Sequence, residues 1–314
     1  MTKSDRKKEY LSSLKSIETE NIIDQLFYRP LGFKIARRLQ HTGVTPNAIT
    51  IISIFVGISA GVMWYFPYHL GLAVMGILAL VTANILDCVD GQLARLTGIS
   101  SEIGRILDGF AGDLWFLTIY IAFAQRLAMQ YSGDLFGFAV NPWWFALLVV
   151  LSAWSHLSQA SLIDYYKTLH LYFVSEEKGK EFETSQSVRK RYQEMESGAV
   201  KLFTWGYHNY TVGQERTTPQ LQKLLGQLRS KYNGDIPADL REELRSGSSQ
   251  LMPLMDLLTF NGRSIILFIS ILFNIVWLYF LWEIVVLNVV RFSLRRKHES
   301  FSKKMKEKID IIEP

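Results

Sequence analysis

The chain has 314 residues, of which 49% are hydrophobic and 20% are charged, and its formal net charge is +5 at pH 7. The apolar residues are concentrated in long runs between charged ends and one charged middle block, which excludes a soluble protein and indicates a polytopic membrane protein. The basic residues lie near these runs, which favours a membrane surface and an anionic substrate over nucleic acid as partners. The single cysteine, Cys88, excludes an intramolecular disulfide, and we expect it to be a small packing residue.

The first 40 residues come before the first apolar run. Residues 1–20 are polar and charged, so we expect no cleavable signal peptide there. Residues 21–40 mix apolar positions with basic side chains, which predicts an amphipathic helix on the membrane surface, with a plain juxtamembrane linker as the alternative. The basic side chains are Arg29, Lys34, Arg37 and Arg38.

The first membrane span is predicted over about residues 45–66. Thr45 suits the N-cap of this helix, and Pro46 suits its first helical position. Asn47 comes next. It either reaches a bound nucleotide or has a capping or helix-packing role.

Gly57 and Gly61 form a G-x-x-x-G pair inside this span. Small residues at this spacing allow two membrane helices to approach closely. The partner helix belongs either to the same chain or to a second copy in a dimer.

The second span, predicted over about residues 69–87, leads into a polar stretch with a strong chemical signal. Asp87 and Asp90 are three residues apart, so on a helix they share one face. Gly91 has no side chain, so a ligand can approach the backbone there. Arg95 follows one turn later and suits a phosphate because its guanidinium is a planar fork.

Gly104 and Asp108 are four residues apart at the start of the third span, which is predicted over about residues 104–123. They share one helical face, and Asp108 supplies a further carboxylate there. A buried charge in a membrane costs several kcal/mol, so clustered carboxylates need a cation. Carboxylates beside an open backbone and an arginine suit Mg²⁺ that holds a diphosphate.

Residues 87–113 resemble the signature of the CDP-alcohol phosphatidyltransferase family, D-x-x-D-G-x-x-A-R-x8-G-x-x-x-D-x-x-x-D. The last signature position is Gly112, and the nearest acid is Asp113, one residue late. The resemblance covers about residues 21–173, with weaker agreement in the last two spans. The positions that match in register are Asp87, Asp90, Gly91, Ala94, Arg95, Gly104 and Asp108.

The resemblance implies a displacement in which an acceptor hydroxyl attacks the β-phosphate of a CDP-linked alcohol and CMP leaves. It also implies a homodimer and one or two Mg²⁺ (or Mn²⁺) ions. In the family a fourth aspartate is both a metal ligand and the general base. The implied metal ligands present here are Asp87, Asp90 and Asp108. The implied seat of the cytidine diphosphate is Gly91, Ala94 and Arg95, while Gly104 lets the two helices approach.

Because Asp113 comes one residue after the signature position, its side chain points in another direction on a regular helix. On a regular helix the fourth residue after Asp108 lies about 40° away from it, whereas Asp113 lies about 140° away. We expect a π-bulge near Gly109–Gly112 to turn the Asp113 side chain back toward the metals, where it acts as ligand and base. The alternatives are another base, such as Glu102 or Asp164, or lost or changed chemistry.

A loop is predicted over residues 126–141 and the fourth span over about 143–163. The second half of this span carries polar residues on one face. Because polar groups are costly in lipid, this face either lines the active-site cavity or bonds neighbouring helices. The face holds Ser152, His156, Gln159 and Ile163.

Residues 168–250 are polar with charged helical patches, which predicts a soluble helical insertion without a catalytic motif. Residues 251–293 are nearly all apolar, and this run is about twice the length of one span. We therefore divide it near Asn274 into spans over about 252–273 and 276–293.

Basic residues are frequent at both ends of the chain, with nine Lys or Arg in the first 44 residues and eight between 291 and 308. The positive-inside rule then places both termini and the motif in the cytoplasm, which requires an even number of spans. The predicted fold is all-α with six membrane spans. The predicted segments are 1–44, the N-terminal segment; 45–167, the catalytic core; 168–250, the insertion; 251–293, the last two spans; and 294–314, a basic tail.

Arg105, Lys167 and Arg263 are predicted near the inner membrane face. They either bind a phosphorylated acceptor, such as an inositol phosphate, or serve only as positive-inside anchors. The leading hypothesis is an enzyme of phospholipid biosynthesis with inositol or inositol phosphate as acceptor. One alternative is another alcohol pair, namely glycerol phosphate as acceptor, or CDP-choline or CDP-ethanolamine with diacylglycerol. The other is a non-catalytic scaffold that binds a CDP-alcohol, which Gly112 favours.

Overall fold

The computed structural model describes residues 3–99, 101–130, 141, 143–175, 177–233 and 235–312, and these ranges contain helices and no strand. Six helical stretches in these ranges are long and apolar enough to cross a membrane. The predicted all-α fold with six membrane-spanning helices is therefore confirmed. The six stretches are Pro46–Tyr65, Leu70–Thr97, Leu107–Gln130, Trp143–Val174, Ala238–Leu272 and Val276–Ile311.

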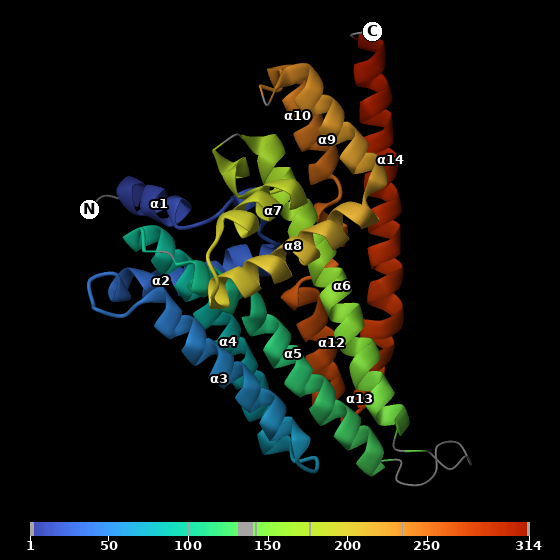
Figure 1. The fold of residues 1–314 in the computed structure, drawn as a ribbon. Coiled ribbons are helices and arrows are strands. Elements are labelled where there is room, and N and C mark those ends of the chain that lie inside the picture. The colour runs from blue at the N-terminus through green and yellow to red at the C-terminus, as the bar shows by residue number, and fades with distance from the viewer. Residues whose placement is uncertain are drawn as a thin grey trace. The chain divides into compact units, whose positions relative to one another are not determined.

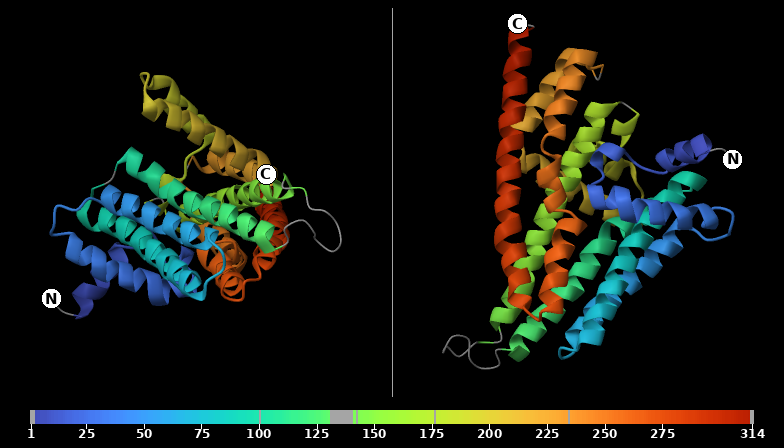
Figure 2. Two further views of the ribbon diagram at one scale, coloured as in Figure 1. Left: turned by 90° about the horizontal axis from the view of Figure 1, so that it is seen from below. Right: turned by 180° about the vertical axis from the view of Figure 1, so that it is seen from behind.

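The helices are divided between two compact units, whose elements can be followed in Figures 1 and 2. The first unit contains Met1–Ser158 and Phe260–Val286, and the second contains Gln159–Thr259 and Leu287–Pro314. Helix α6 (Trp143–Val174) begins in the first unit and ends in the second. The five predicted segments are divided by whether the sequence suits the membrane or water, whereas these two units are defined by packing. The five-segment division stays a prediction.

Three membrane-spanning helices form the centre of the first unit: α3 (Pro46–Tyr65), α4 (Leu70–Thr97) and α5 (Glu102–Gln130) (Figure 1). Helix α3 begins as predicted. The Thr45 hydroxyl accepts a hydrogen bond from the backbone N–H of Ala48 at 3.3 Å, and Pro46 occupies the first helical position.

The G-x-x-x-G pair of α3 contacts α5. A side chain at Gly57 would collide with the ring of Trp115, and one at Gly61 would collide with Thr118. Both partners belong to α5 of the same chain. Of the two predicted alternatives, these glycines therefore serve a helix contact within the chain.

The N-terminal segment packs on α4. Its α2 helix lies against α4 through Gly32, where a side chain would collide with Gln92 and come within 3.0 Å of the Cys88 Cβ. Cys88 is buried, as expected of a packing residue. Burial raises the pKa of Tyr28 to about 12, so its hydroxyl is neutral at physiological pH. The segment contains α1 (Lys3–Ser12), a π-helical turn (Asp24–Tyr28) and α2 (Arg29–Leu39), and its place on the membrane surface stays a prediction.

Two helices, α5 and α6, are longer than predicted. Helix α4 continues to Thr97 and ends at Gly98, whose φ of 69° is left-handed. Helix α5 continues to Gln130, so the loop predicted from residue 126 is wrong over residues 126–130. That stretch reads Arg-Leu-Ala-Met-Gln, and all five are strong helix formers. A change from apolar to polar sequence does not by itself end a helix.

The division of the last apolar run at Asn274 is confirmed. Asn274 has φ 54° and lies between α12 (Phe260–Leu272) and α13 (Val276–Leu281). Asparagine adopts this left-handed conformation more readily than most residues, which is why it marks the turn. One π-helical turn, Trp282–Val286, follows α13 and completes the first unit.

The second unit contains α14 and the part of α6 from Gln159 onward. Helix α9 packs along α14 with a buried row of leucines at helical spacing. Its first turn is capped by Glu299, whose Oε2 accepts a hydrogen bond from the backbone N–H of Gln220 at 2.7 Å. The helices of this unit are α7 (Ser185–Glu194), α8 (Ala199–Thr217), α9 (Pro219–Tyr232), α10 (Ala238–Ser249), α11 (Met252–Leu257) and α14 (Leu287–Ile312).

Candidate metal centre

Three carboxylates meet where α4 and α5 face one another. Asp87 and Asp90 come from one face of α4, and Asp108 comes from the first turns of α5. One oxygen from each carboxylate lies within 4.8 Å of the others. Like charges this close repel unless a cation lies between them, and carboxylate oxygens are the ligands that Mg²⁺ prefers. The donor set therefore fits a hard divalent cation.

A threonine that the motif does not contain fixes one of these carboxylates. The Thr50 hydroxyl, on α3, lies 2.6 Å from Oδ2 of Asp90, and both side chains are buried. A hydrogen bond to a charged acceptor is short and strong, so it holds the carboxylate in one rotamer. Sequence reasoning missed Thr50. The sequence feature that could have indicated it is a polar residue inside an apolar span, one turn after the first helical position.

Arg95 lies one turn after Gly91 on α4, as the motif spacing predicts. Its Nη1 donates hydrogen bonds to the carbonyl oxygens of Gly91 at 2.9 Å and of Ser13 at 3.1 Å. Ala94, between these two residues on the same helix, is half-buried. The guanidinium thus lies beside the open backbone at Gly91, where the motif expects a diphosphate.

Asn47 holds the connection between α4 and α5. Its Nδ2 donates a hydrogen bond to the Ser101 hydroxyl at 3.0 Å, and the same hydroxyl accepts one from the backbone N–H of Gly104 at 2.9 Å. A side chain at Gly104 would collide with Oδ1 of Asn47. These contacts support the packing alternative for Asn47, and they explain why residue 104 has to be a glycine.

The prediction of a π-bulge before Asp113 is wrong. Helix α5 is regularly α-helical from 102 to 130, so Asp113 points away from the face of Asp108. Its Oδ1 lies 3.4 Å from Nε2 of His156, and Asp113 does not belong to the three-carboxylate group. The predicted role of Asp113 as a metal ligand stays a prediction that the position of its side chain does not support. Its role as a base stays a prediction.

His156 belongs to a buried polar group in the first unit. Its Nδ1 lies 3.0 Å from the hydroxyl of Tyr120, opposite the Asp113 contact. These contacts favour helix-to-helix hydrogen bonding over a cavity lining for this part of the polar face of α6. The alternative base Asp164 lies in the second unit, where its Oδ2 accepts a hydrogen bond from the Tyr210 hydroxyl at 3.3 Å. The side chain of Glu102 is outside the described residues.

The predicted acceptor residues have different surroundings. Arg263 is only 2% exposed and forms an ion pair with the fully buried Glu283, which does not support its predicted contact with an acceptor phosphate. Helix α12 turns this side chain inward, where Glu283 of the π-helical turn neutralises it. Lys167, in the second unit, lies 3.4 Å from Asp256. The side chain of Arg105 is outside the described residues.

Comparison with known proteins finds a family model that is similar to the part of the chain with the carboxylate site. Residues 43–175 match the model of the family described as CDP-alcohol phosphatidyltransferase. The matched range includes α3, α4, α5 and α6, and with them Thr50 and the three carboxylates. The resemblance noted in the sequence is therefore confirmed for this part of the chain.

Individual relatives match over a shorter stretch. An archaetidylinositol phosphate synthase from Pyrococcus horikoshii is 37% identical over 75 residues, which is 24% of this chain and 38% of the relative. Proteins named "Putative cardiolipin synthase" from Mycobacterium bovis and Mycobacterium tuberculosis are 33% identical over 75 residues, 24% of this chain and 30% of each relative. The chain thus matches between 30% and 38% of the length of these relatives.

Proposed function

We propose that the protein transfers a phosphoalcohol group from a CDP-linked alcohol to a hydroxyl acceptor and releases CMP, because residues 43–175 match the model of the CDP-alcohol phosphatidyltransferase family. The observation that carries this proposal is the group of three carboxylates with oxygens within 4.8 Å of one another. The product would be a phospholipid or a related phosphodiester. The whole-chain activity is our proposal, since the relatives match only part of their length.

Each residue of the site has a proposed part in this reaction. Asp87, Asp90 and Asp108 hold Mg²⁺ or Mn²⁺, and Thr50 keeps Asp90 in its ligating rotamer. When bound, the metal supplies charge neutralisation for the diphosphate and for the attacking and leaving oxygens. Gly91, Ala94 and Arg95 seat the cytidine diphosphate. Gly104 and Asn47 keep the two metal-binding helices at a fixed separation.

We retain Asp113 as the proposed general base, in partnership with His156 rather than as a metal ligand. Its side chain is 26% exposed, so it is open to an acceptor on one side while His156 fixes it on the other. A carboxylate that does not bind the metal keeps its lone pairs for the proton of the attacking hydroxyl.

The acceptor is proposed to be a small polar alcohol that carries a phosphate, such as an inositol phosphate. The archaetidylinositol phosphate synthase supports this choice by its name and its 37% identity, whereas the mycobacterial relatives are named for cardiolipin synthesis. Arg105 and Lys167 remain proposed contacts for the acceptor. Arg263 does not, because Glu283 neutralises it inside the first unit.

The orientation of the protein in the membrane is proposed from the distribution of basic residues and the number of spans. Both termini and the carboxylate site lie on the cytoplasmic side, because the basic residues flank an even number of spans. A homodimer is proposed from the family resemblance.

The test is CMP release by purified protein with Mg²⁺ and CDP-diacylglycerol, against inositol phosphate, inositol and glycerol phosphate as acceptors. We expect acceptor-dependent release that Asp90→Asn abolishes. No release from any acceptor while CDP-diacylglycerol still binds would contradict the proposal for this donor. CDP-choline and CDP-ethanolamine with diacylglycerol form the second arm of the assay.

A second candidate function is a non-catalytic protein that binds a CDP-alcohol. It is favoured by one observation, the glycine at position 112 where the family has its fourth aspartate. Nucleotide binding without turnover in both arms of the assay would support it.

A further inference from the structure

One helix of the second unit exposes an unusual number of large apolar side chains. Along α8, six such residues are between 37% and 65% exposed. Three of them are Trp or Tyr, the residue types that concentrate where a membrane meets water. The six are Leu202, Phe203, Trp205, Tyr207, Tyr210 and Val212.

The buried side chains that the structure describes on α8 are polar. Thr204, Thr211 and Gln214 are each at most 8% exposed. The two threonine hydroxyls donate hydrogen bonds within the helix, to the carbonyl oxygens of Val200 and Tyr207 at 2.9 Å. A helix that faces water has the reverse pattern, with apolar residues inside and polar residues outside. The environment that suits the exposed face of α8 is therefore apolar.

Helix α8 is attached to α6 at the end of an apolar membrane span. Nε2 of Gln214 donates a hydrogen bond to the carbonyl oxygen of Ser161 at 2.9 Å, and the Tyr210 hydroxyl donates one to Asp164 at 3.3 Å. The apolar run of α6 begins at Trp143 and ends at Ile163, which at 1.5 Å per residue is about the thickness of a bilayer core. These hydrogen bonds join α8 to α6 where the sequence predicts the end of the fourth span.

The neighbouring helix α7 adds positive charge to this surface. Backbone N and Oγ of Ser185, at the start of α7, donate hydrogen bonds to the Glu215 carboxylate at 2.8 and 2.5 Å, which closes α7 and α8 into a hairpin. Arg189 and Lys190 of α7 are exposed. A basic surface beside exposed aromatic residues suits a bilayer that contains anionic lipids.

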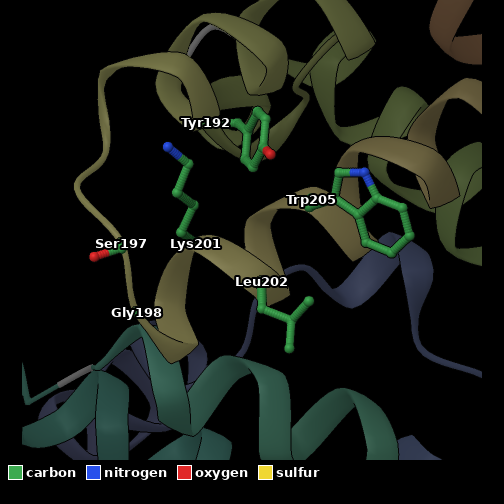
Figure 3. Close-up of a pocket in the computed structure, with 6 residues that line it drawn as sticks. All are labelled: Tyr192, Ser197, Gly198, Lys201, Leu202 and Trp205. Carbon is green, nitrogen blue, oxygen red and sulfur yellow. The ribbon is translucent and has the colours of Figure 1, made fainter.

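A pocket of about 380 Å³ opens between the two helices beside the apolar face (Figure 3). Lys201 and Trp205 project into it from successive turns of α8, next to the ring of Tyr192 (Figure 3). The Lys201 Nζ lies 5.1 Å from the centre of that ring and donates a hydrogen bond to the carbonyl oxygen of Met195 at 2.9 Å. An ammonium beside an aromatic ring, with the exposed Leu202 also lining the pocket, suits a phosphate group attached to an acyl chain.

We propose that the α7–α8 hairpin is a membrane-docking element that binds anionic phospholipid. The apolar face of α8 lies among the lipid glycerols and upper acyl chains, and the Lys201 pocket takes a lipid phosphate. This assignment depends on the protein being an integral membrane protein and does not depend on the proposed transferase reaction. Its test therefore needs no turnover.

The test is spin-label accessibility in the full chain reconstituted into lipid nanodiscs. Labels are placed through Trp205→Cys and, separately, Leu202→Cys. Ser230→Cys on α9, an exposed polar site, is the matched control. Cys88 is buried and stays in place, with the unsubstituted chain as the blank. Access is measured to oxygen, which enters lipid, and to a water-soluble nickel chelate.

We expect labels at 205 and 202 to be more accessible to oxygen than to nickel, and the label at 230 to show the reverse order. Adding phosphatidylglycerol to phosphatidylcholine discs is expected to increase the oxygen access at Leu202→Cys, and Lys201→Gln is expected to remove that increase. Nickel access at 205 and 202 equal to that at 230 would overturn the proposal. Labels shielded from both reagents would also overturn it, because they would indicate a protein partner. An equal response to phosphatidylglycerol with and without Lys201 would overturn it as well.

Discussion

The hydrogen bond between Thr50 and Asp90 is the best-defined contact of the candidate metal centre at the scale of single residues. It joins α3 to the carboxylate pair of α4 at 2.6 Å, in a buried position. A metal ligand fixed by a second residue loses little freedom when the ion binds, so such partners contribute to affinity without touching the metal. Thr50 is therefore a positioning residue for Asp90.

Thr50→Val keeps the shape of the side chain and removes its hydroxyl. We expect the Mg²⁺ concentration for half-maximal CMP release to rise roughly ten- to a hundredfold, the usual effect of losing a partner of a metal ligand. The control is Ser53→Ala, because Ser53 donates only to the carbonyl oxygen of Thr50 at 2.7 Å. An unchanged Mg²⁺ dependence in Thr50→Val would show that Asp90 is held without this contact.

Asp113 can be separated from the metal ligands by its kinetic signature. We expect Asp113→Asn to lower turnover by at least about a hundredfold, the usual contribution of a general base, while CDP-diacylglycerol and Mg²⁺ still bind. Asp164→Asn is the matched control for the alternative base and should leave turnover unchanged. The assay is single-turnover CMP release together with nucleotide binding. Full activity in Asp113→Asn would exclude it as the base.

At the scale of whole elements, the packing of α3 on α5 is set by two glycines. Gly57 and Gly61 leave space that Trp115 and Thr118 of α5 fill, so the helices approach closely. This contact matters for the site because α3 carries Thr50 and α5 carries Asp108.

Gly57→Ala should lower the stability of the chain in detergent. The added methyl group would collide with Trp115, and overpacking of this kind costs about 1–3 kcal/mol. The matched control is Gly112→Ala, where a methyl group meets no atom within 4 Å and alanine favours the helix. Thermal unfolding should therefore shift downward for Gly57→Ala alone. Equal shifts for the two variants would mean that the contact contributes little.

The ion pair between Arg263 and Glu283 joins α12 to the π-helical turn after α13 inside the first unit. Arg263→Met leaves a buried charge unpaired, which costs about 3–5 kcal/mol. We expect the double variant Arg263→Met with Glu283→Leu to recover much of that stability, as measured by thermal unfolding. If Arg263→Met instead raised the KM for the acceptor and left stability unchanged, the sequence-based acceptor role would be restored.

At the scale of the whole molecule, the six membrane-spanning helices make a prediction about orientation. With the six candidate spans of the described residues, both termini are expected on one side, and the flanking basic residues predict that this side is the cytoplasm. Epitope tags at the two ends should both be cleaved by protease added to sealed inside-out vesicles and be protected in right-side-out ones. Protection of one tag and cleavage of the other would require an odd number of spans.

The sequence by itself determined the helical class, the six candidate spans of the described residues, the turn at Asn274 and the three carboxylates of the candidate metal centre. These features depend on local composition and on spacing within one or two turns of a helix, which a sequence records directly. The N-cap at Thr45 and the open backbone at Gly91 follow from the same local rules.

The tertiary structure alone decided how the remaining site residues are used. Thr50 and Asp90, Asp113 and His156, and Arg263 and Glu283 are separated by 40, 43 and 20 residues along the chain and meet only through helix packing. The rotation of each helix about its axis decides which partner a side chain meets, and packing sets that rotation. Because α5 is regular, the Asp113 side chain contacts His156. Because the Arg263 side chain of α12 faces inward, it pairs with Glu283 and not with a phosphate.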